Sequence, residues 1–219
     1  MARTTGKTMR LFILGATGGT GRQLVDEALK RGHQVTALVR SPQKMGAPRE
    51  ALTVIGGNVL SAEALAGAMA GHDAVLSTLG PPGPRRNTIT SEGARATVEA
   101  MQAAGVQRLL IVGVAVLFED AGWLAWVLRR TLLRNVAADS AEMERVVRGS
   151  ALEWTIVRPP RLTNGPRTEG YGVADDHLPA GATGMVSRAD VACFLLDEAE
   201  RPAHVRRVVG IANTKRARA

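Results

Sequence analysis

A glycine-rich segment between an apolar run and a helical pattern constrains the fold of this 219-residue chain more than any other feature. Residues 9–14 are typical of a buried strand, and residues 20–31 carry apolar side chains at helical spacing. Between them, Gly15, Gly18 and Gly21 follow one another at three-residue intervals. Glycines at such positions allow a tight turn, close approach of a ligand to the backbone, and close packing of helix on strand. We therefore interpret the segment as a phosphate-binding turn rather than a plain glycine-rich turn.

Apolar runs and helical patterns continue to alternate after this turn. Strands connected by helices form right-handed crossovers, so the pattern predicts one α/β domain with a Rossmann-type doubly wound parallel sheet. We place this domain at residues 9–212, with basic and flexible tails at 1–8 and 213–219. The further strands are expected at 34–39, 52–55, 74–78, 108–112, 154–157 and 205–211, and the further helices at 61–69, 91–104, 139–148 and 187–198.

Two segments stand outside the alternation. Residues 115–135 combine Trp123 and Trp126 with leucines and arginines, which predicts an amphipathic helix packed on the domain or on a partner subunit. Residues 163–184 contain five glycines and read as a long loop. Because long loops in compact domains are often functional, we expect this loop to cover a substrate.

The net charge of +8 does not indicate a nucleic-acid partner. Residues 1–10 and 206–219 hold eight basic residues and no acidic ones, so the rest of the chain is balanced. Aromatic residues make up only 3% of the chain, whereas a base-stacking surface needs several exposed rings. We therefore expect no specific binding of nucleic acid.

Cysteine content and hydropathy favour a cytoplasmic protein. Cys193 is the only cysteine, which excludes a disulfide within the chain and suits a reducing compartment. The first residues lack the apolar segment of a signal peptide, and the most apolar stretch, residues 109–118, is too short to span a bilayer. We expect no membrane association.

The end of the second predicted strand indicates the type of cofactor. A site selective for NAD(H) places a carboxylate there to bind the ribose hydroxyls, but no acidic residue occurs between Glu27 and Glu50. Arg40 ends the strand instead, and Lys44 follows four residues later. A guanidinium matches the oxygens of a 2′-phosphate, so we predict NADP(H). The alternative is that both are solvated surface bases.

The chain lacks the acid–base pair of ordinary short-chain dehydrogenases. That pair is a tyrosine with a lysine four residues later, but Asp175 stands at this spacing from Tyr171, the only tyrosine. His177 in the predicted loop is a candidate acid or ligand, although a solvated histidine is the simpler reading. No histidine and cysteine cluster has metal-ligand spacing, and Cys193 reads as a core residue.

Several short motifs together resemble one family. They are the glycine turn, Leu38-Val39-Arg40, Asp73-Ala74-Val75, Ser91-Glu92-Gly93-Ala94-Arg95 and Arg158-Pro159-Pro160. The chain resembles, over about residues 9–200, the atypical short-chain dehydrogenase/reductases with an NAD(P)-binding NmrA-like domain. Within that family the biliverdin-IXβ reductases, also known as flavin reductases, are the most similar.

The resemblance implies a cofactor site built from the glycine turn and the ends of the neighbouring strands. The substrate then lies over the nicotinamide at the carboxyl ends of the strands. The implied cofactor-binding residues are Gly15, Thr17, Gly18, Gly19, Thr20 and Gly21, with Arg40 and Lys44 at the 2′-phosphate, Asn58 and Val59 near the adenine, and Leu79, Gly80 and Pro159 near the nicotinamide.

Two departures from the family pattern bear on the substrate. Gly113-Val114 replaces a Thr-Ser pair, and Arg161 replaces a histidine after two prolines. Val114, Arg161 and His177 are thus the candidate pocket residues, and Arg161 is either a ligand for an acidic substituent or a surface residue. Two functions stay open: an NADPH-dependent reductase of flavins, quinones or similar planar acceptors, and an NADP(H)-sensing regulatory module. An isomerase with a tightly held cofactor is disfavoured by the missing pair.

Overall fold

The computed structural model describes residues 7–81, 83, 87–118, 127, 130–168 and 170–214. The main sheet has eight strands in the order β3-β2-β1-β4-β5-β6-β10-β8, and β7 pairs with β9 separately. The elements are β1 (Arg10–Leu14), α1 (Gly19–Lys30), β2 (Gln34–Val39), the 3-10 helix η1 (Pro42–Met45), β3 (Leu52–Gly56), α2 (Ala62–Met69), β4 (Ala74–Ser77), α3 (Ile89–Ala104), β5 (Arg108–Val112), η2 (Ala115–Leu117), α5 (Arg134–Arg148), β6 (Glu153–Arg158), β7 (Arg161–Thr163), β8 (Tyr171–Asp175), β9 (Met185–Ser187), α6 (Arg188–Glu200) and β10 (Arg207–Asn213).

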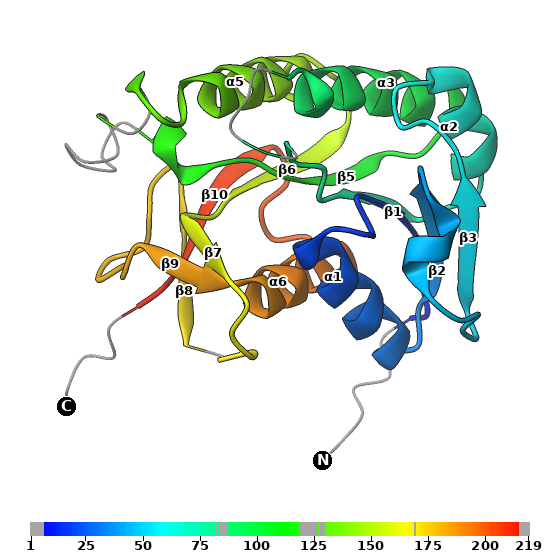
Figure 1. Cartoon of the computed structure of the whole chain (residues 1–219), viewed down its shortest axis with the longest axis horizontal. Coiled ribbons are helices and arrows are strands. Elements are labelled where there is room, and N and C mark those ends of the chain that lie inside the picture. Colours follow the sequence, from blue (N-terminus) through cyan, green and yellow to red (C-terminus); the bar gives the residue numbers. More distant parts are fainter. Residues whose placement is uncertain are drawn as a thin grey trace.

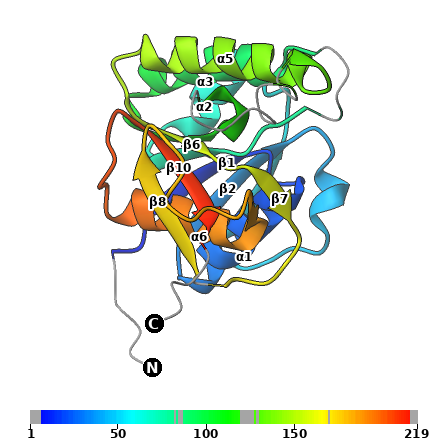
Figure 2. The same cartoon turned by 90° about the vertical axis from the view of Figure 1, so that its left-hand side faces the viewer.

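The sheet lies between two helical layers, as the doubly wound arrangement predicts. Helices α2, α3 and α5 cover one face, and α1 and α6 cover the other (Figures 1 and 2). The seven strands from β3 to β10 are parallel in their pairings, which confirms the Rossmann-type architecture. Such a sheet places the carboxyl ends of its strands along one edge, where ligands of this fold bind.

Each face of the sheet has its own hydrophobic core. Strand residues alternate between the faces, so Phe12 and Leu14 of β1 pack beneath α2, α3 and α5, whereas Leu11 and Ile13 pack against α1 and α6. All four side chains are fully buried. Burial on both faces explains why the central strands read as continuous apolar runs instead of alternating patterns.

The predicted strands and helices are confirmed, with shifts of one to five residues at their ends. The strands at 34–39 and 108–112 have the predicted bounds. Gly32 has φ +84° just after α1, and Gly105 is in the left-handed conformation after α3, as expected for helix ends. The Ser187 hydroxyl accepts a hydrogen bond from the Asp190 N–H and so caps α6, which begins one residue later than predicted.

The expectation of one long loop over residues 163–184 is wrong. Residues 171–175 form β8, which pairs antiparallel with β10 at the edge of the sheet. The stretch before β8 is fastened to α6, because the Thr168 N–H and hydroxyl both donate to the buried Asp190 carboxylate at 2.8 Å. Short exposed strands rich in glycine resemble loops in sequence, so their partner strand decides their structure.

The predicted helix over 115–135 is only partly within the described residues. Residues 115–117 form the short helix η2, and α5 begins at Arg134, five residues before the predicted start. Trp123 and Trp126 lie outside the described residues. At the other end, Asn213 belongs to β10 and Thr214 bridges to Ala182, so the expected tail boundary at residue 213 is two residues too early.

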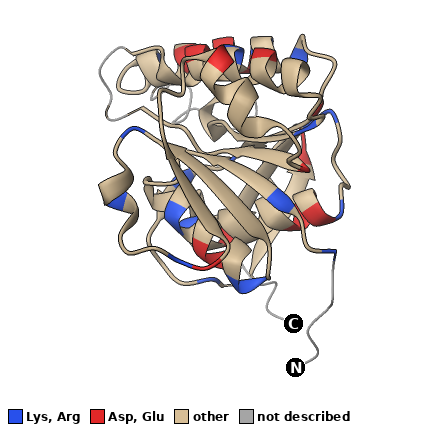
Figure 3. Cartoon of the chain, turned by 90° about the vertical axis from the view of Figure 1, so that its right-hand side faces the viewer, with Lys and Arg blue, Asp and Glu red and all other residues tan. Residues whose placement is uncertain are grey.

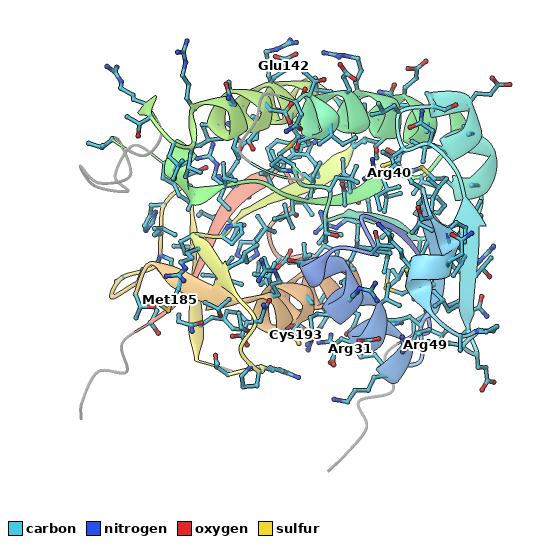
Figure 4. All side chains as sticks on the ribbon, in the orientation of Figure 1. Arg31, Arg40, Arg49, Glu142, Met185 and Cys193 are labelled. Carbon is cyan, nitrogen blue, oxygen red and sulfur yellow. The ribbon has the colours of Figure 1, made fainter. Side chains whose placement is uncertain are left out.

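Charged side chains on the described surface are mixed in sign. Figure 3, which faces the β3 end of the sheet, shows acidic and basic residues on both helical layers. Arg31 joins α1 to α6 through Asp197 at 2.7 Å and Glu200 at 3.0 Å (Figure 4). No helix in the described part of the chain combines the length and apolar character needed to cross a bilayer.

Candidate cofactor and substrate site

The turn between β1 and α1 is packed so closely that Gly15 and Gly21 have no room for a side chain. Gly15 has φ +78°, a conformation that favours glycine, and a Cβ on it would lie 2.8 Å from the backbone of Thr78. A Cβ on Gly21 would lie 2.7 Å from the carbonyl carbon of Gly15 and 2.8 Å from the Cα of Ala16. These contacts bring α1 directly onto the end of β1, which is the close packing that the glycine spacing predicts.

The start of α1 provides the features of an anion site. Gly18 is the residue before the helix, and its N–H closes the turn by donating to the Gly15 carbonyl at 2.9 Å. The first N–H groups of a helix have no acceptor within it, and its dipole favours negative charge at this end. Because no side chain projects from Gly18 or Gly19, a phosphate can closely approach the N–H groups of α1 that follow Gly18. The cradle fits the diphosphate of a dinucleotide.

The ends of neighbouring strands bring the predicted site residues together. The carboxyl end of β4 is fastened to that of β1, because the N–H and hydroxyl of Thr78 donate to the Leu14 carbonyl at 3.0 and 3.1 Å. Leu79 follows directly, and a terminal methyl group of its side chain would lie 2.9 Å from a Cβ on Gly93 of α3. The glycine of the Ser-Glu-Gly-Ala-Arg motif thus packs against the segment that follows β4.

Two basic residues follow the carboxyl end of β2. Arg40 follows β2 directly and is labelled in Figure 4, Lys44 lies in η1, and both are exposed. Within the residues that the structure describes, neither side chain has an ion-pair or hydrogen-bond partner. Both are therefore available to a ligand phosphate. Their binding of the 2′-phosphate stays a prediction.

Arg22 is a site residue that sequence reasoning missed. Its guanidinium donates to the Thr17 carbonyl at 3.2 Å and to the Lys44 carbonyl at 2.7 Å. It therefore ties the glycine turn to η1 and positions the loop that carries Arg40 and Lys44. The available signal was its place directly after Gly21, on the first turn of α1.

The carboxyl ends of the parallel strands form a row that we call the cofactor edge. The segment after β3 lies at one end of this row. Asn58 accepts a hydrogen bond from the Leu60 N–H through its side-chain oxygen at 3.1 Å, and Val59 is buried. Ser61 then caps α2 by accepting from the Ala64 N–H. This short turn lies two strands away from β1, where the resemblance implies the adenine.

The carboxyl ends of β5 and β6 form the other half of the cofactor edge. Gly113 donates from its N–H to Val157, and Ala115 donates to Pro159 at 3.0 Å, so the two strand ends run on side by side. Val114 is half-buried between these contacts. Arg161 begins β7 just beyond Pro159, is exposed, and has no side-chain partner among the described residues.

The described segments at the strand ends hold no carboxyl, imidazole, phenol or thiol side chain. These segments are residues 15–21, 40–46, 57–61, 78–81, 113–118 and 159–164. Their polar groups are hydroxyls, amides, backbone N–H groups, the guanidinium groups of Arg40 and Arg161, and the ammonium group of Lys44, which lies in η1 after β2. Such a set can bind and orient a ligand, and no side chain in the described segments after β4, β5 and β6 readily transfers a proton.

His177 lies on the surface beside β10. Its backbone packs against Gly210 in the middle of β10, and the neighbouring Asp176 N–H donates to the Val208 carbonyl. Gly210 pairs with Arg158, the last residue of β6, so His177 lies level with the carboxyl end of that strand. Its ring bonds locally, to the Asp175 carbonyl, and its part in the pocket stays a prediction.

Tyr171 lies against α6 instead of in a catalytic pair. Its ring meets Phe194 edge to face at 6.4 Å, and Cys193 beside it is buried, as expected for a core residue (Figure 4). Burial raises the pKa of the Tyr171 phenol to about 12, and the charge of Asp197 adds to this effect. A catalytic tyrosine needs the opposite shift, because its pKa must approach the working pH.

Tyrosine ionisation tests this placement directly. Because Tyr171 is the only tyrosine, a spectrophotometric titration at 295 nm reports it alone. We expect the tyrosinate absorbance to appear at about pH 12 in the folded protein and near pH 10 in denaturant. A midpoint below pH 10 in the folded protein would contradict the buried position.

Comparison with known proteins agrees with this geometry. The sequence model of the NAD(P)H-binding family matches residues 15–202, which is most of the chain. The chain belongs to the NAD(P)H-binding family. Its structural neighbours include proteins named as reductases and as epimerases of the short-chain dehydrogenase type, so the resemblance to atypical, NmrA-like members is confirmed.

Individual relatives span nearly the whole chain. An uncharacterised Bacillus subtilis protein, YwnB, is 29% identical and covers 90% of this chain and 94% of its own length. A 3-diazoavenalumate denitrifying reductase from Streptomyces is 34% identical, covering 82% of this chain and 67% of the reductase. A solved structure named a "putative NADH-flavin reductase" from Streptococcus pneumoniae superimposes with a TM-score of 0.76 at 26% identity, covering 94% of this chain and all of the other.

The family membership shows which cofactor this chain binds. The cofactor is NAD(P)H, which supplies a hydride at its nicotinamide when it is bound. The protein is thus an NAD(P)H-binding member of an oxidoreductase family. The preference for NADP(H) and the acceptor of the hydride are questions for the site itself.

Proposed function

We propose that this protein is an NADPH-dependent reductase of flavins, quinones or similar planar conjugated acceptors. The observation that carries the proposal is that the described segments after β4, β5 and β6 hold no carboxyl, imidazole, phenol or thiol side chain. An acceptor of this class gains a hydride from the reduced nicotinamide and a proton from water, which leaves NADP⁺. The chain's own residues then bind, align and shield the two molecules, and no side chain has to transfer a proton.

The walls of the proposed acceptor site are consistent with a planar apolar molecule. Val114 and Pro159 border the edge beside the nicotinamide end, and Leu79 lies on its other side. Arg161 at the rim is a candidate for an acidic substituent, such as the phosphate of a flavin mononucleotide. Among the relatives, one structure is named for flavin reduction and one curated enzyme for a reductive step, which supports a reductase.

The acceptor class is tested by steady-state oxidation of NADPH with a panel of flavins and quinones. We expect turnover with several planar acceptors, and faster turnover with flavin mononucleotide than with riboflavin if Arg161 binds the phosphate. Tight NADPH binding without turnover across the whole panel would overturn the reductase proposal. It would favour the alternative, a sensor that distinguishes NADPH from NADP⁺ and engages a partner protein.

Preference for NADPH over NADH is the second part of the proposal. Arg40 and Lys44 stand at the position where NAD(H)-selective sites hold a carboxylate, and both cations lack a described acidic partner. Replacing Arg40 by alanine removes a charge-assisted hydrogen bond of about 1.5–3 kcal/mol to the 2′-phosphate. We expect NADPH affinity to fall by about tenfold or more, while NADH affinity changes by less than about twofold.

Fluorescence titration of the reduced cofactors measures both affinities on the same Arg40→Ala preparation. NADH serves as the internal control, because it lacks only the 2′-phosphate. Equal losses for NADPH and NADH would contradict the assignment of Arg40, and so would no loss for either.

A further inference from the structure

An arginine from α6 lies over the glycine turn. A Cβ on Gly19 would stand 2.7 Å from Nε and 2.8 Å from Cδ of Arg188. Gly19 is the first residue of α1, and its φ is not positive, so its backbone conformation does not call for glycine. The missing side chain instead makes room for the Arg188 guanidinium directly beside the start of α1.

The Arg188 guanidinium is held by neutral groups. Its Nη1 donates to the side-chain oxygen of Asn164 at 2.6 Å and, more weakly, to the Leu162 carbonyl at 3.5 Å. Within the described residues it has no carboxylate partner, and no acceptor is found for Nε or Nη2. The guanidinium is therefore oriented without being neutralised, and two of its donor atoms are available.

Other arginines that are buried or half-buried are neutralised. Arg31 pairs with Glu27, Asp197 and Glu200, Arg108 pairs with Glu198, and Arg158 pairs with Glu144. Leaving a half-buried charge without a counter-ion is costly unless a ligand supplies one. The unpaired charge of Arg188 lies beside the N-terminus of α1, which itself favours an anion.

The backbone that carries Arg188 is rigidly placed. Ser187 caps α6, and the fully buried Asp190 receives hydrogen bonds from the Ser187 hydroxyl and from Thr168. Helix α6 also packs along α1, the helix that begins at Gly19 (Figure 1). The distance between the Arg188 backbone and the glycine turn is thus set by two packed helices, not by a loop.

We propose that Arg188 binds the diphosphate of the dinucleotide, opposite the N–H groups of α1, and that Asn164 positions its guanidinium. This inference rests on NAD(P)H binding at the glycine turn and not on the identity of the acceptor. Arg188 contributes equally to NADPH and NADH, because both carry the diphosphate. Arg40, in contrast, is assigned to the 2′-phosphate alone.

The test separates the two phosphates with cofactor fragments. ADP carries a diphosphate and no 2′-phosphate, whereas 2′-AMP carries a 2′-phosphate and no diphosphate. For Arg188→Gln we expect calorimetry to show a loss of about tenfold to hundredfold in affinity for NADPH, NADH and ADP. Affinity for 2′-AMP is expected to stay within twofold of the wild type.

Arg201→Gln is the matched control, since it removes the same charge from the exposed opposite end of α6. We expect this control to bind all four ligands as the wild type does. Unchanged ADP affinity in Arg188→Gln would overturn the proposal, as would an equal loss for ADP and 2′-AMP. Failure of the wild type to bind any nicotinamide cofactor would instead overturn the assignment of the glycine turn.

Two further variants act on Arg188 without removing it. Gly19→Ala places a methyl group where Nε and Cδ lie, and Asn164→Ala removes the neutral acceptor that orients Nη1. We expect each to weaken ADP binding by severalfold while leaving 2′-AMP binding unchanged. If both bind ADP as the wild type does, the position of Arg188 has no role in diphosphate binding.

Discussion

Gly21→Ala is expected to abolish detectable NAD(P)H binding and to lower the free energy of unfolding by about 1–3 kcal/mol, the usual cost of overpacking. The added Cβ would meet the carbonyl carbon of Gly15 at 2.7 Å and the Cα of Ala16 at 2.8 Å. Both are backbone atoms that cannot rotate away. The start of α1 must therefore move off β1, and the N–H groups that face the diphosphate move with it.

The matched control is Gly67→Ala in α2, where an added Cβ meets nothing within 4 Å. Because alanine favours helix, we expect the free energy of unfolding of this variant to rise by about 0.5–1 kcal/mol. We expect it to bind the cofactor as the wild type does. Urea unfolding and cofactor titration measure both effects. Normal binding by Gly21→Ala would show that the turn does not hold the cofactor in the way we describe.

The second large effect is expected at the buried ion pair between α5 and β6. Arg158 donates from Nε and Nη2 to the two carboxylate oxygens of Glu144 at 2.8 and 2.7 Å. Both residues are less than one-tenth exposed, and the guanidinium lies 4.5 Å from the centre of the Phe118 ring. Glu144→Ala leaves a buried charge without its partner, so we expect a loss of about 3–5 kcal/mol in the free energy of unfolding.

Glu142→Ala is the control on the same helix. The Glu142 side chain is exposed and pairs with Arg145 and Arg95 at the surface (Figure 4). We therefore expect Glu142→Ala to lower the free energy of unfolding by no more than about 1 kcal/mol. The double variant Glu144→Leu with Arg158→Leu should recover much of the stability lost in Glu144→Ala, because no unpaired charge remains. Equal unfolding free energies for Glu144→Ala and Glu142→Ala would contradict this account.

The pair also bears on the site. Arg158 ends β6 and directly precedes Pro159, whose carbonyl accepts from Ala115 on the edge of the proposed acceptor site. Glu144 also packs against Gly113, because one of its carboxylate oxygens lies 3.2 Å from the position of a Cβ there. The family motif Arg-Pro-Pro thus has a structural role at the base of the site.

The sequence by itself determined the features that depend on local chemistry. Strand, turn and helix around Gly15–Gly21 follow from glycine spacing and hydrophobic periodicity, both of which act within a few residues. The caps at Ser61 and Ser187 and the helix ends at Gly32 and Gly105 are equally local. Because crossovers between parallel strands are right-handed, these elements were also enough to predict the doubly wound sheet.

The tertiary structure decided what depends on partners distant in sequence. Residues 171–175 become a strand only because β10, more than thirty residues later, offers an unpaired edge, and this pairing fixes the backbone of His177 against Gly210. Arg188 reaches Gly19 across 169 residues because α1 and α6 pack on the same face of the sheet. Periodicity and spacing report which way a side chain faces within its own element, but they do not report which element stands opposite.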